Sequence, residues 1–182
     1  MGEPVPSAGM TKLELAQQAA ASAIDGFADD DEVGLWAFST QLGGNGEPWV
    51  QLQAVGPAKS AVPAMQADIA SLVPDGGTGL YATLRAAQRR MLADLSTDRI
   101  NAIVLLSDGR NENPDDEDLD GLLRQLTGES VDTSVRVFTI GYGEGADAEA
   151  LRAIAQASRG QYYEATDPAS IEKVLTSVLS NF

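Results

Sequence analysis

The sequence predicts a doubly wound α/β domain, a mostly parallel sheet with helices on both faces, as in Rossmann-like folds. Strand-like and helix-like segments alternate through residues 100–182, which is typical of strand–helix–strand units with right-handed crossovers. Residues 33–38 and 100–106 are almost continuously apolar, as in strands buried on both faces. The chain's 182 residues suffice for one full core, so we expect a single domain over residues 1–182.

Helices are predicted where apolar residues recur at helical spacing. The first begins in a capping box formed by Thr11 and Glu14, and the last begins at Asp167 with Pro168 in its first position. The predicted helices cover residues 11–27, 58–72, a stretch following Thr78, and segments beginning near Leu119, Leu151 and Pro168.

Strands are predicted in the apolar segments between these helices. Residues 49–55 alternate between apolar and polar and follow a glycine-rich loop, so we expect them to pair with residues 33–38 as a hairpin at the sheet edge. Residues 100–106 are the expected central parallel strand, followed by strands at 135–140 and 161–164. Residues 2–9 are expected to supply no strand, because Pro4 and Pro6 remove two backbone donors.

The charge balance and the absence of two residue types exclude several functions. The chain has 27 acidic and 12 basic residues, a net charge of −15, so nucleic acid and anionic membranes are poor partners. No apolar run is long enough to insert into a membrane. With no histidine and no cysteine, thiol nucleophiles, imidazole bases and the usual zinc sites are excluded, and a bound metal must take oxygen ligands. These absences favour binding over catalysis.

Three loops follow predicted strands or precede predicted helices at the edge where such sheets bind ligands: residues 74–80, 107–114 and 141–147. In the first, Gly76 and Gly77 present the Thr78 hydroxyl, either as a helix cap or as an oxygen ligand. In the second, Asp108 directly follows the expected central strand, either with its carboxylate in the ligand crevice or as a turn residue bonding its own backbone.

The third loop allows a different function. The pattern Gly141-x-Gly143-x-x-Ala146 lies between a strand and a helix, and Glu164 ends the next strand, as in an NAD-type nucleotide-binding enzyme. Three acidic residues crowd the helix N-terminus where a pyrophosphate would bind: Glu144, Asp147 and Glu149. A turn-forming glycine loop is the other interpretation.

The segments GGTGLY (76–81), VLLSDG (104–109) and RVFTIGYG (136–143) together resemble von Willebrand factor A (VWA) domains of the bacterial type, over essentially the whole chain. The resemblance implies a metal-ion-dependent adhesion site. In that family, a D-x-S-x-S motif after the first strand, a threonine and an aspartate hold Mg²⁺ or Mn²⁺, and a carboxylate of a partner protein completes the shell. Thr78 and Asp108 match the threonine and the aspartate.

The resemblance also implies a gap at the start of the domain. Family members commonly carry D-x-S-G-S-M, whose methionine would be Met1, so the first strand and the motif's aspartate and serines would lie upstream of the given sequence. That strand is central in the family, between residues 33–38 and 100–106. We expect a swapped segment, a neighbouring chain, an upstream stretch or a rearranged sheet to close the gap, which allows a strand-swapped or strand-complemented homo-oligomer.

The resemblance therefore implies a non-enzymatic interaction or adhesion module whose complete form binds an acidic residue of a protein partner through Mg²⁺ or Mn²⁺. With only Thr78 and Asp108, metal binding by this chain is expected to be weak or absent. The family alone favours the cell envelope or the exterior of the cell. The alternatives are the nucleotide-binding enzyme and a metal-free scaffold, in which Thr78 is a cap and Asp108 a turn residue.

Overall fold

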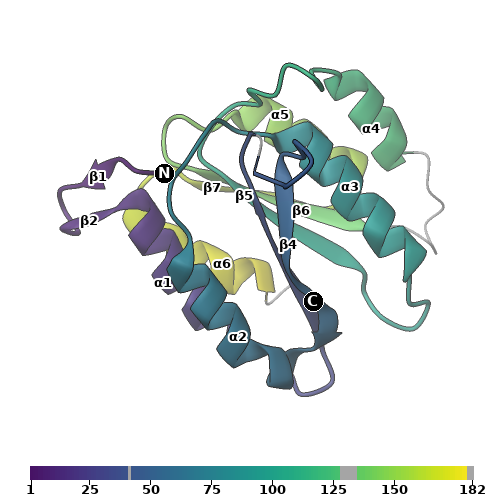
Figure 1. The fold of residues 1–182 in the computed structure, drawn as a ribbon, viewed down its shortest axis with the longest axis horizontal. Helices are drawn as coiled ribbons and strands as arrows, with labels where there is room; N and C mark the ends of the chain where they lie inside the picture. The colour runs from purple at the N-terminus through teal and green to yellow at the C-terminus, as the bar shows by residue number, and fades with distance from the viewer. Residues whose placement is uncertain (41, 128–134, 180–182) are drawn as a thin grey trace.

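The computed structural model describes residues 1–40, 42–127 and 135–179, which form helices packed around three small sheets (Figure 1). The strands are β1 (Pro4–Val5), β2 (Met10–Thr11), β3 (Glu32–Phe38), β4 (Trp49–Pro57), β5 (Ala102–Ser107), β6 (Arg136–Tyr142) and β7 (Tyr162–Ala165). The helices are α1 (Lys12–Ile24), α2 (Ala58–Ser71), α3 (Leu80–Ala93), α4 (Leu119–Thr127), α5 (Ala148–Ala157), the 3₁₀ turn η2 (Pro168–Ser170) and α6 (Ile171–Leu179).

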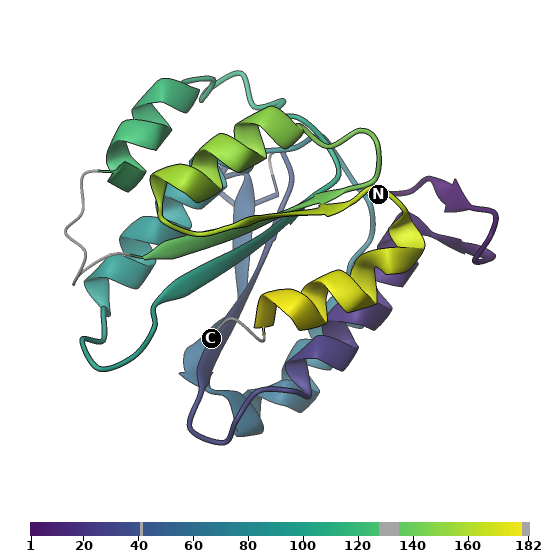
Figure 2. The ribbon, with the colours of Figure 1, turned by 180° about the vertical axis from the view of Figure 1, so that it is seen from behind.

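The C-terminal sheet is parallel, with β6 between β5 and β7. Helices α1 and α6 pack on one of its faces and α3, α4 and α5 on the other (Figure 2). Every residue of β6 after Arg136 is buried, as expected for an apolar strand with a neighbour on each side and helices on both faces. The predicted α/β architecture with a parallel sheet and helices on both faces is confirmed for this part of the chain.

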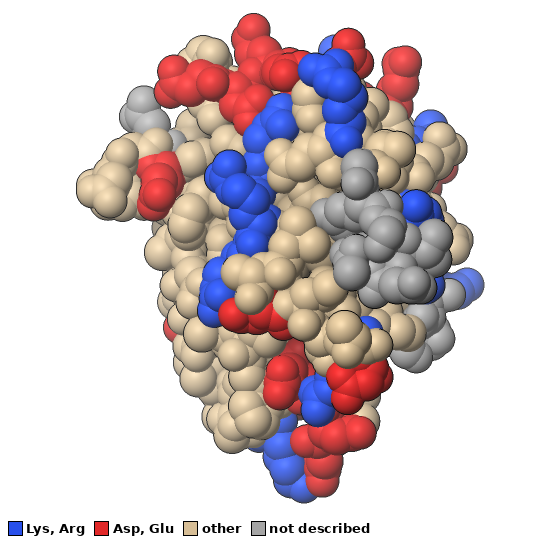
Figure 3. Space-filling view, turned by 90° about the vertical axis from the view of Figure 1, so that its right-hand side faces the viewer, with Lys and Arg blue, Asp and Glu red and all other residues tan. Residues whose placement is uncertain are grey.

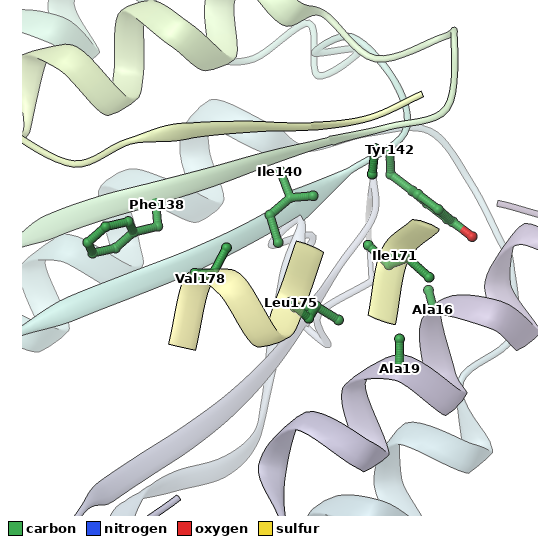
Figure 4. Close-up of a cluster of buried hydrophobic side chains, with 9 residues drawn as sticks. Ala16, Ala19, Phe138, Ile140, Tyr142, Ile171, Leu175 and Val178 are labelled. Atoms are coloured by element: carbon green, nitrogen blue, oxygen red, sulfur yellow. The ribbon is translucent and has the colours of Figure 1, made fainter. Parts of the chain in front are cut away.

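One core cluster joins β6 to the helices of the α1 and α6 face (Figure 4). Alternate residues of β6 point into it, namely Phe138, Ile140 and Tyr142. Small residues on α1, Ala16 and Ala19, let α6 approach closely. The apolar stripe of α6 closes the cluster with Ile171, Leu175 and Val178.

The hairpin prediction is confirmed, because β3 pairs with β4 in antiparallel orientation. Trp36 and Trp49 stack across this pair with ring centroids 4.4 Å apart, an aromatic contact that stabilises the hairpin. The described residues do not form one continuous sheet, however. The β3–β4 hairpin and the β5–β6–β7 sheet are separate, and no ladder of hydrogen bonds joins β3 to β5.

Two burial predictions fail for the same reason. Residues 33–38 were expected to be buried on both faces, yet each is only partly buried. Residues 100–106 were expected to form a central strand, but β5 begins at Ala102 and is paired only with β6, while Ile100 is 53% and Val104 37% exposed. Each strand lacks a neighbour on one side among the described residues, so side chains that a neighbour would cover reach solvent.

The N-terminal segment partly departs from expectation. Pro4–Val5 does form a strand, but it has two residues and pairs only with Met10–Thr11, so it adds nothing to the larger sheets. Helix α1 begins in the predicted capping box, with the Thr11 hydroxyl accepting from the Glu14 N–H and the Glu14 carboxylate accepting from the Thr11 N–H. The segment therefore forms a short antiparallel strand pair that ends at the N-cap of α1.

Candidate functional site

The first loop of the site is anchored to the end of β3. The Thr40 N–H donates to the Gly77 carbonyl (2.9 Å), and the Gly77 N–H donates to the Thr40 hydroxyl (2.8 Å). Gly76 has φ +66°, and a Cβ there would lie 2.5 Å from Ser39 Oγ, so this position requires glycine on both conformational and steric grounds. These contacts fix the backbone that presents Thr78.

Thr78, in the first loop, connects that loop to the second. Its N–H donates to the Glu112 carboxylate (3.0 Å), and its carbonyl accepts from the Glu112 N–H (2.8 Å). A Cβ added to Gly109 would lie 2.9 Å from Thr78 Oγ1, so the hydroxyl is against the backbone just after Asp108. The structure therefore brings the two predicted site residues together.

The capping interpretation of Thr78 does not fit the structure. Helix α3 has Gly79 at its N-cap position without a side-chain cap. The amide oxygen of Asn111 instead accepts from the N–H groups of Leu80 (3.0 Å) and Tyr81 (3.3 Å). Within the described part of the chain the Thr78 hydroxyl has no hydrogen-bond partner, and it is partly exposed, so it remains available as an oxygen ligand.

Asp108 lies directly after β5, with a side chain that is only 18% exposed. Its carboxylate pairs with the amino group of Met1, and no hydrogen bond to its own turn is found among the described residues. The turn is closed by Ser107, whose hydroxyl donates to the Gly109 carbonyl (3.2 Å). The Asp108 carboxylate thus holds a cationic group in this structure.

The third loop closes the site from the side of β6. A Cβ at Gly145 would lie 3.0 Å from the Asp108 carbonyl, so the loop passes directly over Asp108. Tyr142 is fully buried at the end of β6 and its hydroxyl donates to the Lys12 carbonyl (2.9 Å). Burial raises the pKa of Tyr142 to about 12, with further contributions from the negative charges of Asp108 and Asp167. The negative charge of Asp108 therefore contributes to the raised pKa of a tyrosine in the core beneath the site.

The glycines of the third loop have structural explanations. A Cβ at Gly141 would lie 2.6 Å from the Tyr162 hydroxyl. Gly143 has φ +76°, and the Lys12 side chain lies over it, with Cε and Nζ each 3.0 Å from the position of a Cβ. Asp147 caps α5 by accepting from the Ala150 N–H (3.1 Å), which places a carboxylate where the helix N-terminus would meet a pyrophosphate. These contacts favour the turn-forming interpretation.

Sequence reasoning missed three contributors to the site. Glu112 and Asn111 lie in the second loop, and their roles depend on contacts with residues more than 30 positions away. Met1 contributes through its backbone amino group, which no side-chain motif can show. Among the described residues, no group of three or more acidic side chains is placed to hold a metal ion. Nor does this part contain a helix both long and apolar enough to cross a bilayer.

Comparison with known proteins identifies the family of the chain. The family model for the von Willebrand factor type A domain matches residues 6–177. No curated protein sequence matches the chain.

Among solved structures, a von Willebrand factor type A protein from Catenulispora acidiphila superposes with a TM-score of 0.75 at 22% identity, over 91% of this chain and 37% of that one. The pilus adhesin SpaC from Lactobacillus rhamnosus GG gives 0.70 at 15% identity, over 93% and 27%. Proximal thread matrix protein 1 from the mussel byssus, with a zinc-occupied MIDAS motif (the metal-ion-dependent adhesion site), gives 0.66 at 14% identity, over 92% and 43%.

This chain thus spans less than half the length of each of these three structures. At these identities the superpositions establish the fold alone, whereas the family model covers nearly the whole chain. The chain belongs to the von Willebrand factor type A domain family.

Proposed function

We propose that this chain is a non-enzymatic protein-interaction module and that Thr78 and Asp108 are its ligands for a divalent cation, Mg²⁺ or Mn²⁺. The observation that carries the proposal is the position of the Thr78 hydroxyl, which lies 2.9 Å from where a Cβ on Gly109 would be and is therefore next to the backbone that follows Asp108. A hydroxyl and a carboxylate are hard oxygen donors of the kind that Mg²⁺ selects. The adhesin and the zinc-occupied MIDAS protein among its structural relatives support this assignment.

Two donors leave most of an octahedral shell to water and to a partner. Glu112 is close by, but its carboxylate is engaged by the Thr78 N–H (3.0 Å). We therefore expect this chain alone to bind Mg²⁺ or Mn²⁺ weakly, with tight binding requiring additional ligands.

The partner is proposed to present an acidic residue to the bound cation. The chain's net charge of −15 would repel a carboxylate in the absence of that cation. Figure 3 shows that the charges are not spread evenly: on one face acidic side chains gather toward both ends, with Lys and Arg in a column between them. Binding of an acidic group should therefore depend on the metal, and nucleic acid and membrane surfaces are not proposed as partners.

The test is a titration of the protein with Mn²⁺, followed by calorimetry and by the paramagnetic relaxation of water protons, which detects weak binding. We expect a dissociation constant of about 1 mM or weaker, because two protein ligands supply little of the shell. Asp108→Asn and Thr78→Val should each weaken this binding further. Asp120→Asn, which neutralises an exposed acid on α4, is the matched control and should leave it unchanged.

Two outcomes would contradict the proposal. Micromolar binding by the unmodified chain would show that the site is complete, and equal binding by Asp108→Asn would show that the metal binds elsewhere. Stabilisation by NAD(H) but not by divalent cations in a thermal-shift assay would instead support the nucleotide-binding alternative. A metal-free scaffold would show no response in either assay.

A further inference from the structure

Helix α5 and strand β7 form an open pocket that shares no residue with the candidate metal site. The pocket has a volume of about 270 Å³ and lies where β7 begins. Its lining residues are Arg152 and Gln156 from α5, and Gly160, Gln161 and Tyr162 from the turn and the start of β7. Four of the five present polar side chains, so the pocket suits a polar or charged group.

The backbone around this pocket is fixed to the sheet. The buried hydroxyl of Ser158, at the end of α5, accepts from the Val137 N–H of β6 (3.0 Å). Gly160 lies so close to the Val137 carbonyl that no Cβ would fit. The turn from α5 into β7 therefore has a defined position relative to β6, and it presents its side chains from there.

The Arg152 guanidinium is held over an aromatic ring. Its central carbon lies 4.5 Å from the centre of the Tyr162 ring, a cation–π contact. The ring is also confined at its far end, because the position of a Cβ on Gly141 would be 2.6 Å from the Tyr162 hydroxyl. Arg152 is exposed, and within the described part of the chain its guanidinium has no hydrogen bond or ion pair. Its N–H donors are thus oriented and available, an arrangement that suits a carboxylate.

Strand β7 has a free edge, since it pairs only with β6 among the described strands. Helices α5 and α6 cover its two faces (Figure 2). On the β6 side, the carbonyls of Gln161 and Ala165 accept backbone hydrogen bonds. Alternate residues of a strand bond to the same neighbour, so the N–H and C=O groups of Tyr162 and Glu164 point away from β6. These groups can pair with another extended segment.

The free edge and the pocket meet at Tyr162. Residues opposite each other in neighbouring strands direct their side chains to the same face of the sheet, and the Tyr162 ring packs against the cluster beneath α5. A residue of an added strand opposite Tyr162 would therefore point toward the Arg152 guanidinium. The next residue on that face would lie opposite Glu164, an exposed acid without an ion pair among the described residues.

We propose that a short extended segment of a partner protein adds to the edge of β7 and places an acidic side chain in this pocket, on Arg152. The residue two positions away in that segment is basic and pairs with Glu164. Backbone hydrogen bonds to the edge contribute affinity, and the two charged side chains provide specificity. The net charge of −15 would repel a segment that carried acidic residues alone.

The probe is the synthetic peptide Thr-Lys-Val-Glu-Val-Lys-Thr, which has a base two positions from the acid on each side and therefore fits β7 in either direction. Its control has glutamine in place of the glutamate. Because the control is more positive, nonspecific attraction to this acidic protein would favour the control. Binding is followed by fluorescence anisotropy of the labelled peptides. We expect the glutamate peptide to bind about tenfold more tightly, since its carboxylate accepts charge-assisted hydrogen bonds.

Arg152→Gln tests the site from the protein side. This variant should bind the two peptides equally, because the cation that distinguishes them is gone. Arg89→Gln on α3 is the matched control, since Arg89 is also exposed and has no ion pair within the described residues. It removes the same charge and should retain the preference for the glutamate peptide. Circular dichroism verifies that both variants fold.

Amide hydrogen exchange measured by nuclear magnetic resonance locates the bound peptide. We expect new protection of the N–H groups of Tyr162 and Glu164, which point to the free edge. All measurements contain EDTA, so divalent cations take no part in them. The inference is therefore independent of the metal site, and either can fail while the other holds.

Three results would overturn the inference. Equal binding of the two peptides to the unmodified protein would show that the acid is not recognised. Loss of the preference in both Arg152→Gln and Arg89→Gln would show an effect of overall charge. A preference for the glutamate peptide without protection of Tyr162 and Glu164 would show that no strand is added to β7.

Discussion

Tyr142 links the candidate site to the core at the scale of single residues. Its ring is fully buried between β6 and the two helices below, and its hydroxyl donates to the Lys12 carbonyl at the start of α1. Because burial, and after it the negative charges of Asp108 and Asp167, raises the pKa of the phenol, the tyrosine stays neutral well into the alkaline range. The core residue beneath the candidate site is thus a neutral tyrosine with a hydrogen-bonded hydroxyl.

We predict that Tyr142 makes stability fall at alkaline pH. Its pKa is raised from 10.0 to about 12, so the folded state holds the phenolic proton more tightly than the unfolded state does. The corresponding stabilisation is complete below the unfolded pKa of 10 and is lost as pH rises toward 12. Urea unfolding at several pH values across this range measures it.

Tyr142→Phe provides the comparison for that measurement. It should lower stability at neutral pH by about 1 kcal/mol, through loss of one hydrogen bond. It should also reduce the alkaline loss of stability relative to the unmodified protein. An unchanged alkaline slope would show that the other tyrosines or general charge repulsion dominate.

Thr78 and Asp108 stay predictions as site residues; they could be singled out from the sequence because Thr78 follows a pair of glycines before a helix and Asp108 follows an apolar strand. The chemistry around them could not be predicted in the same way. Glu112 engages the Thr78 N–H across 34 positions, and Asn111 takes over the capping that Thr78 was free to provide. Such contacts depend on how two loops fold against each other, which no spacing rule contains.

At the scale of elements, α3 shows how one loop stabilises another. Its first N–H groups are satisfied by Asn111 from the loop after β5, and the Asn111 amide group in turn donates to the Asp116 carbonyl (2.8 Å). In addition, Arg85 on α3 donates through Nε to the Asp116 carboxylate (2.9 Å). Helix α3 and the loop after β5 therefore depend on each other.

We predict that Asn111→Ala destabilises the protein by about 1 kcal/mol, within the 0.5–2 kcal/mol range of lost helix caps. The N–H groups of Leu80 and Tyr81 would lose their acceptor. Chemical denaturation measures the change in the free energy of unfolding. Asn45→Ala, in the exposed loop between β3 and β4, is the control and should have little effect. Equal effects of the two substitutions would contradict the capping role.

Element prediction succeeded where one-dimensional patterns are sufficient. The capping box of α1, the β3–β4 hairpin and the parallel β6 strand all follow from spacing and composition. Burial of β3 and β5 could not be predicted correctly, because an apolar strand is buried only when neighbours are present on both sides. An apolar composition shows that a strand could be buried on both faces. Whether it is buried depends on which elements lie next to it in the folded structure.

At the scale of the whole molecule, the two larger sheets differ in how their backbones are protected. β6 has a neighbour on each side and is buried after Arg136, whereas every residue of β3 is at least partly exposed and its pairing is one-sided. Local opening should therefore require less free energy in the hairpin than in the C-terminal sheet.

We predict that amide hydrogen exchange separates the two sheets. Amides of β6 should exchange most slowly, near the global unfolding limit, while those of β3 that are not bonded to β4 should exchange fastest among the larger strands. Native-state exchange followed by mass spectrometry provides the measurement. Uniform protection of β3 and β6 would mean that both sheets open only as a single unit.

The loop that contains Gly77 and Thr78 connects the two larger sheets. It is hydrogen-bonded to the end of β3 on one side and to the loop after β5 on the other, so it is a shared boundary of two otherwise unpaired sheets. A cation bound at Thr78 and Asp108 would act as a cross-link between them, and its binding free energy would add to the stability of their relative arrangement. By reciprocity, whatever fixes the two sheets together raises the affinity for the cation by the same factor.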